Sequence, residues 1–415
     1  MTKLLWTQKR DFGPAARFGH AMVFDVARGK VVMTGGRSRD GTPLDDTWAW
    51  DGDGWTQIAD MGPSPRCDLS MAYDGSRERV VLFGGTSGEV AFGDTWEWDG
   101  DAWTQMADSG PSARSSTAMT FVSVDGKVLL VGGASSAGDL LGDTWTWDGT
   151  NWSQVEDTGF SPRRDHVLAY DPGRKRATAF GGRDADGSCR DTWEWDGSLW
   201  TQKADFGPPG SFGGSMVFAE SRCTLYGGVS DGSVPGNQQS VYQTTWDWDG
   251  NHWTERQDIG PGPRVSHAMA WDARRNRVVL FGGITSPLDA PDAAQSATNS
   301  TWEYKTETVP GLIPLTGVAV SPNLISSAAG GTVTLSLTLA APAPAEGNLV
   351  LLHYSSDAGI AALGRLGFYG GVVVRGATMD VTMSVIPPNA LAPQGITIEA
   401  LSGGASFTTF LKISP

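Results

Sequence analysis

Three arginines occupy places where the surrounding sequence pattern does not require a basic residue. Arg37 and Arg183 each follow a Gly-Gly pair, and Arg164 follows a second arginine. The planar guanidinium group is a natural binder of carboxylate and phosphate groups. These residues therefore predict a site for an anionic ligand if the fold brings them together.

Carboxyl and aromatic side chains lie in the same short segments. Phe18 and Phe212 hold the position that Arg164 holds in its own copy of the pattern, and we expect them to form apolar walls of the pocket. Asp68 and Asp165 follow that position directly. They either belong to the site or pair with the arginines and cancel their charge, and the sequence leaves both interpretations open.

His20, His166 and His267 share one place in three copies of the pattern. Three histidines on a ring suit a metal ion, but a side chain that recurs at a fixed place is typical of packing. We therefore expect a structural role and no metal, while His20 and His166 remain candidate ligand contacts.

Two acidic segments look like fragments of calcium loops. Asp184-Ala185-Asp186-Gly187 and Asp51-Gly52-Asp53-Gly54 both lack the terminal Glu of an EF-hand. Because Asp-Gly is also a strong hairpin signal, we expect turns there, and we expect no cofactor.

The elements that position these residues belong to an internal repeat of about 49 residues. In the clearest copy, the apolar run Val80-Val81-Leu82-Phe83 precedes a diglycine, Trp96 and Trp98 alternate on one strand, and Trp103 opens the next strand after an Asp-Gly turn. The diglycine recurs at Gly35–Gly36, Gly84–Gly85, Gly132–Gly133, Gly181–Gly182, Gly227–Gly228 and Gly282–Gly283. A repeat arginine precedes the apolar run at Arg17, Arg66, Arg114, Arg163 and Arg264, with Ser211 in the fifth copy, and we expect these arginines to be buried and hydrogen-bonded.

This unit resembles the kelch motif, and the resemblance covers about three quarters of the chain. It implies an all-β fold: a six-bladed kelch β-propeller over residues 1–308. The sixth copy lacks its final tryptophan strand, whereas Leu5-Trp6-Thr7-Gln8 supplies such a strand at the start of the chain. We expect this N-terminal strand to complete the last blade and to remove the open edge of the ring.

Residues 309–415 have a different composition, without tryptophan and rich in Ala, Thr, Val and Pro. The segment Thr332–Leu339 alternates polar and apolar residues, as a half-buried strand does, and the further candidates are Leu349–Tyr354, Gly371–Val374, Met379–Val385, Ile396–Leu401 and Phe407–Ile413. This part resembles the small Ig-like β-sandwich domains of bacterial surface and secreted proteins, which implies an exported protein. The N-terminus carries no signal-peptide core.

Composition excludes several classes of protein. A net charge of −15 repels phosphate backbones, so we expect no nucleic-acid partner. No apolar stretch is long enough for a membrane helix, so we expect no membrane insertion. The three cysteines, Cys67, Cys189 and Cys223, do not form a disulfide framework and are expected as buried thiols. We also expect a monomer.

The kelch resemblance implies a ligand site at one mouth of the central channel. The chain shows no nucleophile–base motif, which favours a non-catalytic module that binds a small anionic molecule, a glycan or a peptide. One alternative is a mutarotase- or epimerase-like enzyme, because six-bladed kelch propellers include sialic-acid mutarotases. A weaker alternative is an oxidase similar to galactose oxidase, a family with seven blades and a copper site that this chain does not match.

Overall fold

The computed structural model describes residues 6–9, 13–156, 159–232, 240–257, 260–288, 290 and 292–305, and the strands of the C-terminal part. The chain divides into two compact units, Met1–Lys305 and Thr306–Pro415. No helix among the described residues is long and apolar enough to cross a lipid bilayer.

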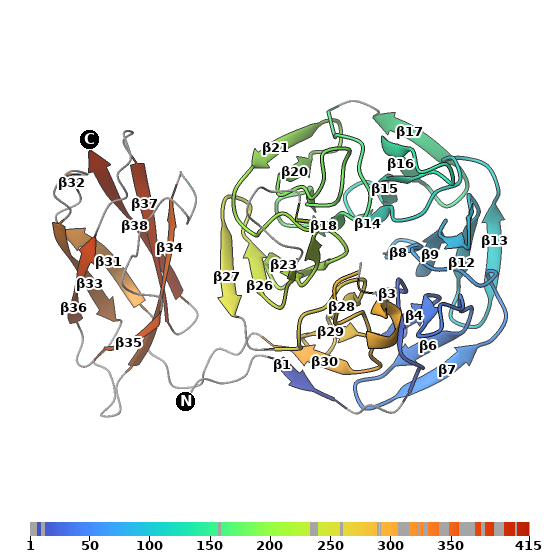
Figure 1. The fold of residues 1–415 in the computed structure, drawn as a ribbon, viewed down its shortest axis with the longest axis horizontal. Coiled ribbons are helices and arrows are strands. Elements are labelled where there is room, and N and C mark those ends of the chain that lie inside the picture. Colours follow the sequence, from blue (N-terminus) through green and yellow to red (C-terminus); the bar gives the residue numbers. More distant parts are fainter. Residues whose placement is uncertain are drawn as a thin grey trace. The chain divides into compact units, whose positions relative to one another are not determined.

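The first unit is a ring of six four-stranded antiparallel sheets around a central channel (Figure 1). In each blade the first strand lines the channel and the last lies at the rim, as the predicted propeller requires. The first three blades are β3 (Ala21–Asp25), β4 (Lys30–Thr34), β6 (Thr47–Trp50) and β7 (Trp55–Ala59); β8 (Ser70–Asp74), β9 (Arg79–Phe83), β12 (Thr95–Trp98) and β13 (Trp103–Ala107); and β14 (Ala118–Val122), β15 (Lys127–Ala134), β16 (Leu140–Trp147) and β17 (Trp152–Glu156). The others are β18 (Val167–Asp171), β19 (Arg176–Phe180), β20 (Thr192–Trp195) and β21 (Trp200–Ala204); β22 (Ser215–Ala219), β23 (Arg222–Tyr226), β26 (Thr245–Trp248) and β27 (Trp253–Gln257); and β28 (Ala268–Asp272), β29 (Arg277–Phe281), β30 (Thr301–Tyr304) and β1 (Trp6–Gln8).

The N-terminal strand closes the ring, as the sequence predicted. Strand β1 pairs antiparallel with β30, and Trp6 lies opposite Tyr304. The indole of Trp6 is 1 % exposed and contacts the rings of both Tyr304 and Tyr226, each at a centroid distance of 5.1 Å. The two ends of the propeller sequence are therefore joined within a single blade.

A tryptophan on the outermost strand of every blade is hydrogen-bonded to the preceding blade. Trp6 Nε1 donates to Thr245 Oγ1 at 3.1 Å, and Trp103 Nε1 donates to Thr47 Oγ1 at 3.0 Å. The other four pairs are Trp55–Thr301, Trp152–Thr95, Trp200–Thr144 and Trp253–Thr192. The recurring tryptophans thus pack between blades, and none of the 18 is among the exposed large apolar side chains of the described residues.

The repeat arginines are buried, as predicted, and four of them form ion pairs inside their own blade. Arg17 contacts both carboxylate oxygens of Asp46, at 2.6 and 2.8 Å, and its Nη1 also donates to the carbonyl of the first diglycine residue, Gly35. The equivalent pairs are Arg66–Asp94, Arg114–Asp143 and Arg163–Asp191. Each guanidinium thereby fixes the diglycine turn, where φ is positive at both glycines.

The second unit contains two sheets. Its strands are β31 (Leu315–Ser321), β32 (Leu324–Ser326), β33 (Gly331–Leu339), β34 (Asn348–Ser356), β35 (Gly370–Val374), β36 (Thr378–Val385), β37 (Gln394–Ser402) and β38 (Ala405–Ser414). One sheet has the order β31-β33-β36 and the other β32-β38-β37-β34-β35. The six predicted strands are all present, whereas β31 and β32 were not predicted. The Ig-like assignment stays a prediction.

The closure predicts the outcome of a substitution at Trp6. Trp6→Ala removes a buried indole and its hydrogen bond, and should lower the free energy of unfolding of the propeller by about 3–5 kcal/mol. Urea denaturation followed by tryptophan fluorescence measures this change. The matched control is Thr7→Ala on the exposed side of the same strand, which should change stability by at most about 0.5 kcal/mol. Equal effects of the two substitutions would contradict the closure.

Candidate functional site

One mouth of the channel is built from six pairs of residues, one in each blade. Each pair joins the residue after a diglycine to the residue after the repeat-arginine position, and the two lie opposite each other as neighbouring extended segments. In the first blade β2 (Arg17–Phe18) pairs with β5 (Arg37–Ser38), so that Phe18 faces Arg37. The other pairs are Cys67–Thr86, Ser115–Ala134, Arg164–Arg183, Phe212–Val229 and Val265–Ile284. The structure therefore brings the two predicted sets of residues together.

A closed ring of backbone hydrogen bonds surrounds the channel just below these pairs. In every blade one N–H donates to the carbonyl of the preceding blade, over distances of 2.7–3.0 Å. The six members are Gly19, Asp68, Ser116, Asp165, Gly213 and Ser266. The ring satisfies backbone groups that would otherwise be unpaired at the edges of the innermost strands.

All six ring residues adopt positive φ, from 53° to 64°. Asp, Ser and Gly suit such positions better than bulky or β-branched residues do. Glycine at position 19 also makes room for its neighbour, because a Cβ there would lie 2.5 Å from Asp68 Oδ1. The backbone geometry thus places the carboxyl groups of Asp68 and Asp165 at the constriction.

The three predicted arginines lie at this mouth, and each has a partner. Arg37 Nε lies 2.8 Å from Cys67 Sγ. Arg164 Nε is 3.6 Å from Asp165 Oδ2, and Arg183 Nε is 3.5 Å from Asp231 Oδ2. The side chains of Arg164 and Arg183 remain 41 % and 43 % exposed, so the ion pairs do not remove their guanidinium groups from solvent.

Asp68 and Asp165 are acids with perturbed proton affinity. Burial and the charge of Asp68 raise the pKa of Asp165 to about 6, and burial also raises the pKa of Asp68. Asp165 is also hydrogen-bonded to the side chain of Ser116, and the Cys67 thiol donates a hydrogen bond to Asp68 Oδ2. The mouth therefore holds a carboxyl group that exchanges protons close to neutral pH.

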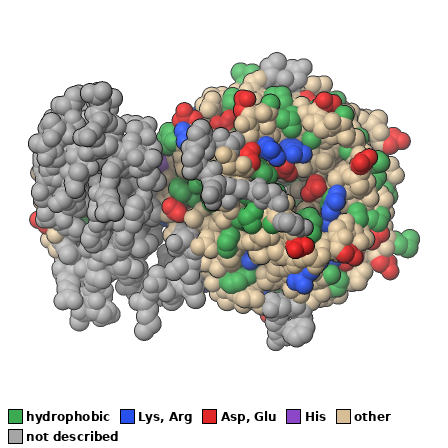
Figure 2. Space-filling model, in the orientation of Figure 1, with side chains coloured by type: hydrophobic (Ala, Val, Ile, Leu, Met, Phe, Trp, Pro, Cys, Tyr) green, Lys and Arg blue, Asp and Glu red, His purple; other side chains and the backbone are tan. Residues whose placement is uncertain are grey.

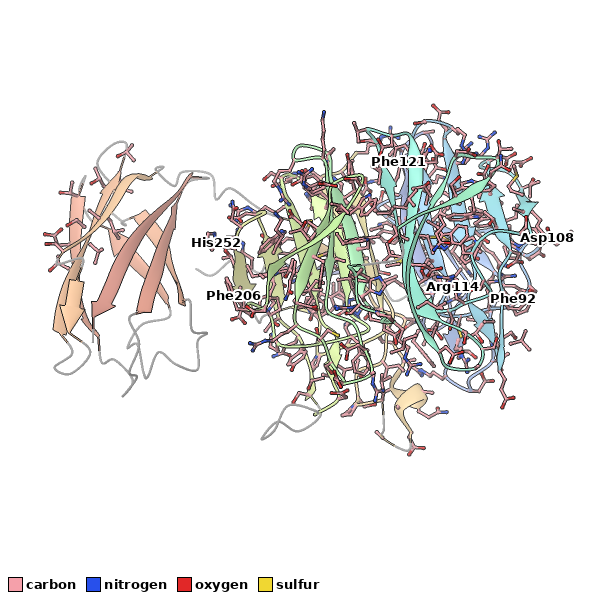
Figure 3. The ribbon with its side chains drawn as sticks, turned by 90° about the horizontal axis from the view of Figure 1, so that it is seen from above. Phe92, Asp108, Arg114, Phe121, Phe206 and His252 are labelled. Atoms are coloured by element: carbon pink, nitrogen blue, oxygen red, sulfur yellow. The ribbon has the colours of Figure 1, made fainter. Side chains whose placement is uncertain are left out.

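The opposite side of the mouth is apolar. Phe212, Val229, Val265 and Ile284 form a buried cluster with Ala293 of η1 (Ala293–Ser296), and Phe18 packs against it. The loop bearing η1 is tied to the first blade, since Arg39 Nε donates to the Ala297 carbonyl at 2.8 Å. In Figure 3 this short helix projects from one face of the propeller. Figure 2 shows that face, with acidic, basic and apolar side chains near its middle.

The predicted site residues thus fall into two groups. Phe18, Arg37, Asp68, Arg164, Asp165, Arg183 and Phe212 all lie at the mouth. Sequence reasoning missed the roles of Cys67, Ser116 and Asp231, and that of the apolar residues Val229, Val265 and Ile284. The sequence carries only part of this signal, because Asp231 lies in a long loop that departs from the repeat. Residues 233–239 of that loop are outside the described residues.

His20 and His166 lie between blades. The ring of His20 packs on Phe281, and that of His166 on Phe160. Each also lies against a diglycine of the preceding blade, since a Cβ on Gly282 or Gly132 would lie 2.8 or 3.0 Å from the imidazole Cε1. Burial, together with Arg17 or Arg163, lowers the pKa of each to about 3. These histidines are neutral, as is His267. All three also line a small cavity of about 120 Å³ together with Asp68, Ser116 and Asp165, so His20 and His166 stay predicted ligand contacts.

The acidic segments that resembled calcium loops form turns. Asp51 Oδ1 accepts hydrogen bonds from the N–H groups of Asp53 and Gly54, and Asp184 Oδ1 accepts from those of Asp186 and Gly187. The described residues contain no cluster of three or more His, Cys, Asp or Glu side chains suited to a metal ion.

The perturbed acid predicts a pH-dependent stability. Folded Asp165 holds its proton more tightly than the unfolded chain does, so the folded state loses stability as pH rises from about 4 to about 6. Asp165→Asn removes that loss and suits a φ of 57°. We expect the variant to melt higher than the wild type at neutral pH, with no such advantage near pH 4, in thermal unfolding followed by circular dichroism.

The control for this experiment has the opposite sign. Burial alone would raise the pKa of Asp191, but its hydrogen bonds and ion pair with Arg163 lower it. Its contribution is present at neutral pH and is lost as pH falls, so Asp191→Asn should destabilise the protein at neutral pH and much less in acid. Two shifts of the same sign would contradict the assigned environments.

Comparisons with known proteins agree with the propeller fold. The KLHDC2/KLHL20/DRC7 Kelch-repeats domain model matches residues 1–167. The solved structure of YjhT superposes with a TM-score of 0.55 at 16 % identity, covering 72 % of this chain and 96 % of that one; at this identity the likeness concerns the fold alone. No curated protein sequence matches. Residues 1–167 thus match a kelch-repeat family model, and the first unit as a whole has the fold of a six-bladed β-propeller.

Proposed function

We propose that the arginine-bearing mouth is a binding site for a small hydroxylated carboxylate such as an acidic sugar. The observation that carries this proposal is the combination at one mouth of exposed guanidinium groups, inner carboxyl groups and an apolar wall. Each of the three features matches one part of such a ligand.

The carboxylate of the ligand would meet the arginines. Arg164 and Arg183 are cross-strand neighbours in one blade, and Arg37 faces the same channel from the first blade. The ion-pair distances of Arg164 and Arg183, 3.6 and 3.5 Å, are longer than those of a charge-assisted hydrogen bond. A ligand carboxylate can therefore compete for these guanidinium groups at modest cost.

The hydroxyl groups of the ligand would meet Asp68, Asp165 and Ser116. Ionised carboxyl groups accept hydrogen bonds, and a protonated carboxyl donates one. Because the pKa of Asp165 is about 6, this residue offers both forms near neutral pH. The inner ring thus suits a polyhydroxylated body better than it suits a second anionic group.

The carbon face of a sugar ring would lie on the apolar wall. Phe212 and Phe18 belong to one cluster, and Arg183 Cζ lies 5.6 Å from the centre of the Phe212 ring. A ligand that contacts Phe212 therefore also lies close to a guanidinium group. This proximity would select ligands whose charge and apolar face are adjacent.

Binding can be tested by titration calorimetry with glucuronate and sialate, with glucose and a short acidic peptide for comparison. We expect the acidic sugars to bind best, because glucose lacks the charge and the peptide lacks the hydroxyl groups. Arg183→Ala should weaken acidic-sugar binding at least tenfold, since a charge-assisted hydrogen bond contributes about 1.5–3 kcal/mol. Arg37→Ala should act in the same direction.

The matched control is Arg176→Ala. Arg176 belongs to the same blade as Arg183 but lies at the hairpin between β18 and β19, where it donates to the Lys175 carbonyl. Its loss should leave binding unchanged. The proposal would be refuted if glucose bound as tightly as glucuronate, or if Arg176→Ala weakened binding as much as Arg183→Ala.

A second function, anomer interconversion of the same acidic sugar, is favoured by the Asp68–Asp165 pair. Mutarotation needs one group that removes a proton and one that supplies it, and efficient groups have pKa values near the working pH. If the pair acts in this way, Asp165→Asn should slow the interconversion at least a hundredfold, as measured by NMR exchange, while glucuronate still binds. Rates equal to the uncatalysed reaction in the wild type would leave only the binding function.

A further inference from the structure

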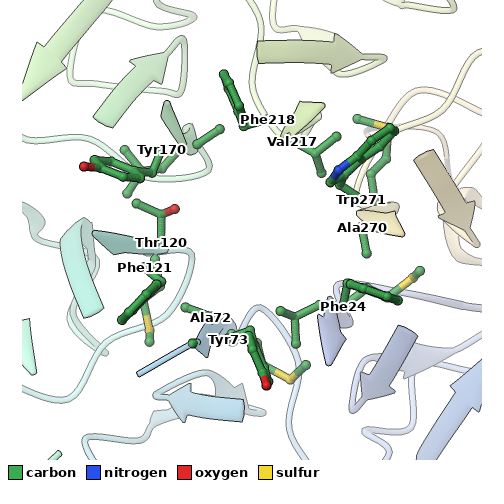
Figure 4. A pocket seen from close by; sticks show the side chains of 18 of the residues that line it. Phe24, Ala72, Tyr73, Thr120, Phe121, Tyr170, Val217, Phe218, Ala270 and Trp271 are labelled. Carbon is green, nitrogen blue, oxygen red and sulfur yellow. The ribbon is translucent and has the colours of Figure 1, made fainter. Parts of the chain in front are cut away.

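The end of the channel opposite the arginine-bearing mouth opens into an apolar cup of about 440 Å³. Its walls are the innermost strands of all six blades, and each blade contributes one aromatic side chain from the same position of its strand (Figure 4). These residues are Phe24, Tyr73, Phe121, Tyr170, Phe218 and Trp271. Figure 3 shows Phe121 near the face opposite the one from which η1 projects. The cup is therefore separate from the mouth, and the hydrogen-bonded ring lies between them.

The lining also includes Met22, Met71, Met119, Met216 and Met269, with Leu168 in the remaining blade. Methionine is flexible and polarisable and makes favourable contacts with aromatic rings. None of the residues that line the cup is charged. A charged ligand group would lose its hydration there without an ionic partner, so the lining selects an uncharged occupant.

Two residues break the repeat inside this cup, and both add a polar atom. Thr120 stands where the other blades carry Val23, Ala72, Ala169, Val217 and Ala270, and Trp271 is the only indole among the six aromatic residues. In Figure 4 the Thr120 hydroxyl and the Trp271 nitrogen point toward the middle of the channel from roughly opposite sides, whereas the hydroxyl groups of Tyr73 and Tyr170 point away from it. No hydrogen bond joins either inward atom to a described residue.

We propose that this cup is a second binding site, for an uncharged, flat aromatic molecule with a hydroxyl or carbonyl group at each end. The aromatic and methionine side chains would contact the faces and edges of its rings. Trp271 Nε1 would donate a hydrogen bond to one end group, and Thr120 Oγ1 would bond to the other. Small-molecule sites combine a mostly apolar lining with a few placed polar groups in this way.

The probe for this site is 2,6-dihydroxynaphthalene, a flat molecule with hydroxyl groups at opposite ends. Calorimetric titration of the full chain should show saturable one-to-one binding. Naphthalene-2,6-dicarboxylate tests the exclusion of charge, and 1,10-decanediol tests a flexible chain with the same end groups. Both should bind at least tenfold more weakly than 2,6-dihydroxynaphthalene.

The variants follow substitutions that the repeat itself tolerates. Trp271→Phe introduces the residue type found at the same position in three other blades, at Phe24, Phe121 and Phe218. Thr120→Val introduces the residue type found at Val23 and Val217. Each should leave the melting temperature nearly unchanged and weaken probe binding about five- to tenfold, which corresponds to the loss of one hydrogen bond. Arg183→Ala, at the other mouth, should leave probe binding unchanged, whatever its effect on acidic sugars.

Three results would overturn the proposal. The first is that 2,6-dihydroxynaphthalene does not bind the wild type. The second is that Trp271→Phe and Thr120→Val bind it as tightly as the wild type does. The third is that the decanediol or the dicarboxylate binds the wild type as tightly as 2,6-dihydroxynaphthalene does. Sedimentation of the ligand-free protein gives a further criterion: a dimer that dissociates in Trp271→Phe would assign the cup to a second copy of the chain instead.

Discussion

The contact on which the propeller depends is the packing of an outermost tryptophan against the neighbouring blade. Each indole fills the space between two sheets and donates its N–H to a threonine of the preceding blade. A blade has two such interfaces, so no single sheet buries its faces alone. The ring is stable only when it is complete, and for that reason the first strand of the chain must serve as the last strand of the sixth blade.

The architecture was readable from the sequence because each signal is repeated. The spacing of Val80–Phe83, the diglycine and the tryptophan strand recurs in six copies, and the missing strand in the last copy indicated the closure by Trp6. The mouth was readable only in part. Arg164 and Arg183 were found because they depart from the repeat, but the partner of Arg183 is Asp231, in a loop that no repeat describes. The sequence could not place the histidines, because only coordinates show that their rings pack between blades and also line the cavity beside Asp68 and Asp165.

The fifth and sixth blades show how the repeat is relaxed near the mouth. In the fifth blade both members of the Arg–Asp pair are replaced, by Ser211 and Thr244, whereas in the sixth blade Arg264 remains and Ser300 stands in place of the acid. Burial lowers the pKa of Arg264 to about 10, since the carboxylate found in the other blades is missing. The same two blades supply the apolar wall and the two longest departures from the repeat, the segments 229–243 and 284–300 after their diglycines. The two blades that lack the repeat Arg–Asp pair are thus the ones that differ most from the common blade.

The hydrogen-bonded ring gives the two ends of the channel different chemistry. Residues above it come from loops, which can change without disturbing a blade, and they have become charged on one side and apolar on the other. Residues below it come from the innermost strands, whose side chains must also pack between sheets, and there the chain carries aromatic, methionine, aliphatic and small residues. Within that limit an indole in place of a phenyl ring and a threonine in place of a valine add polar atoms that point into the channel, whereas the hydroxyl groups of Tyr73 and Tyr170 point away from it. Trp271 and Thr120 are these two changes, and they occur in blades three apart in a ring of six, so that they face each other across the channel.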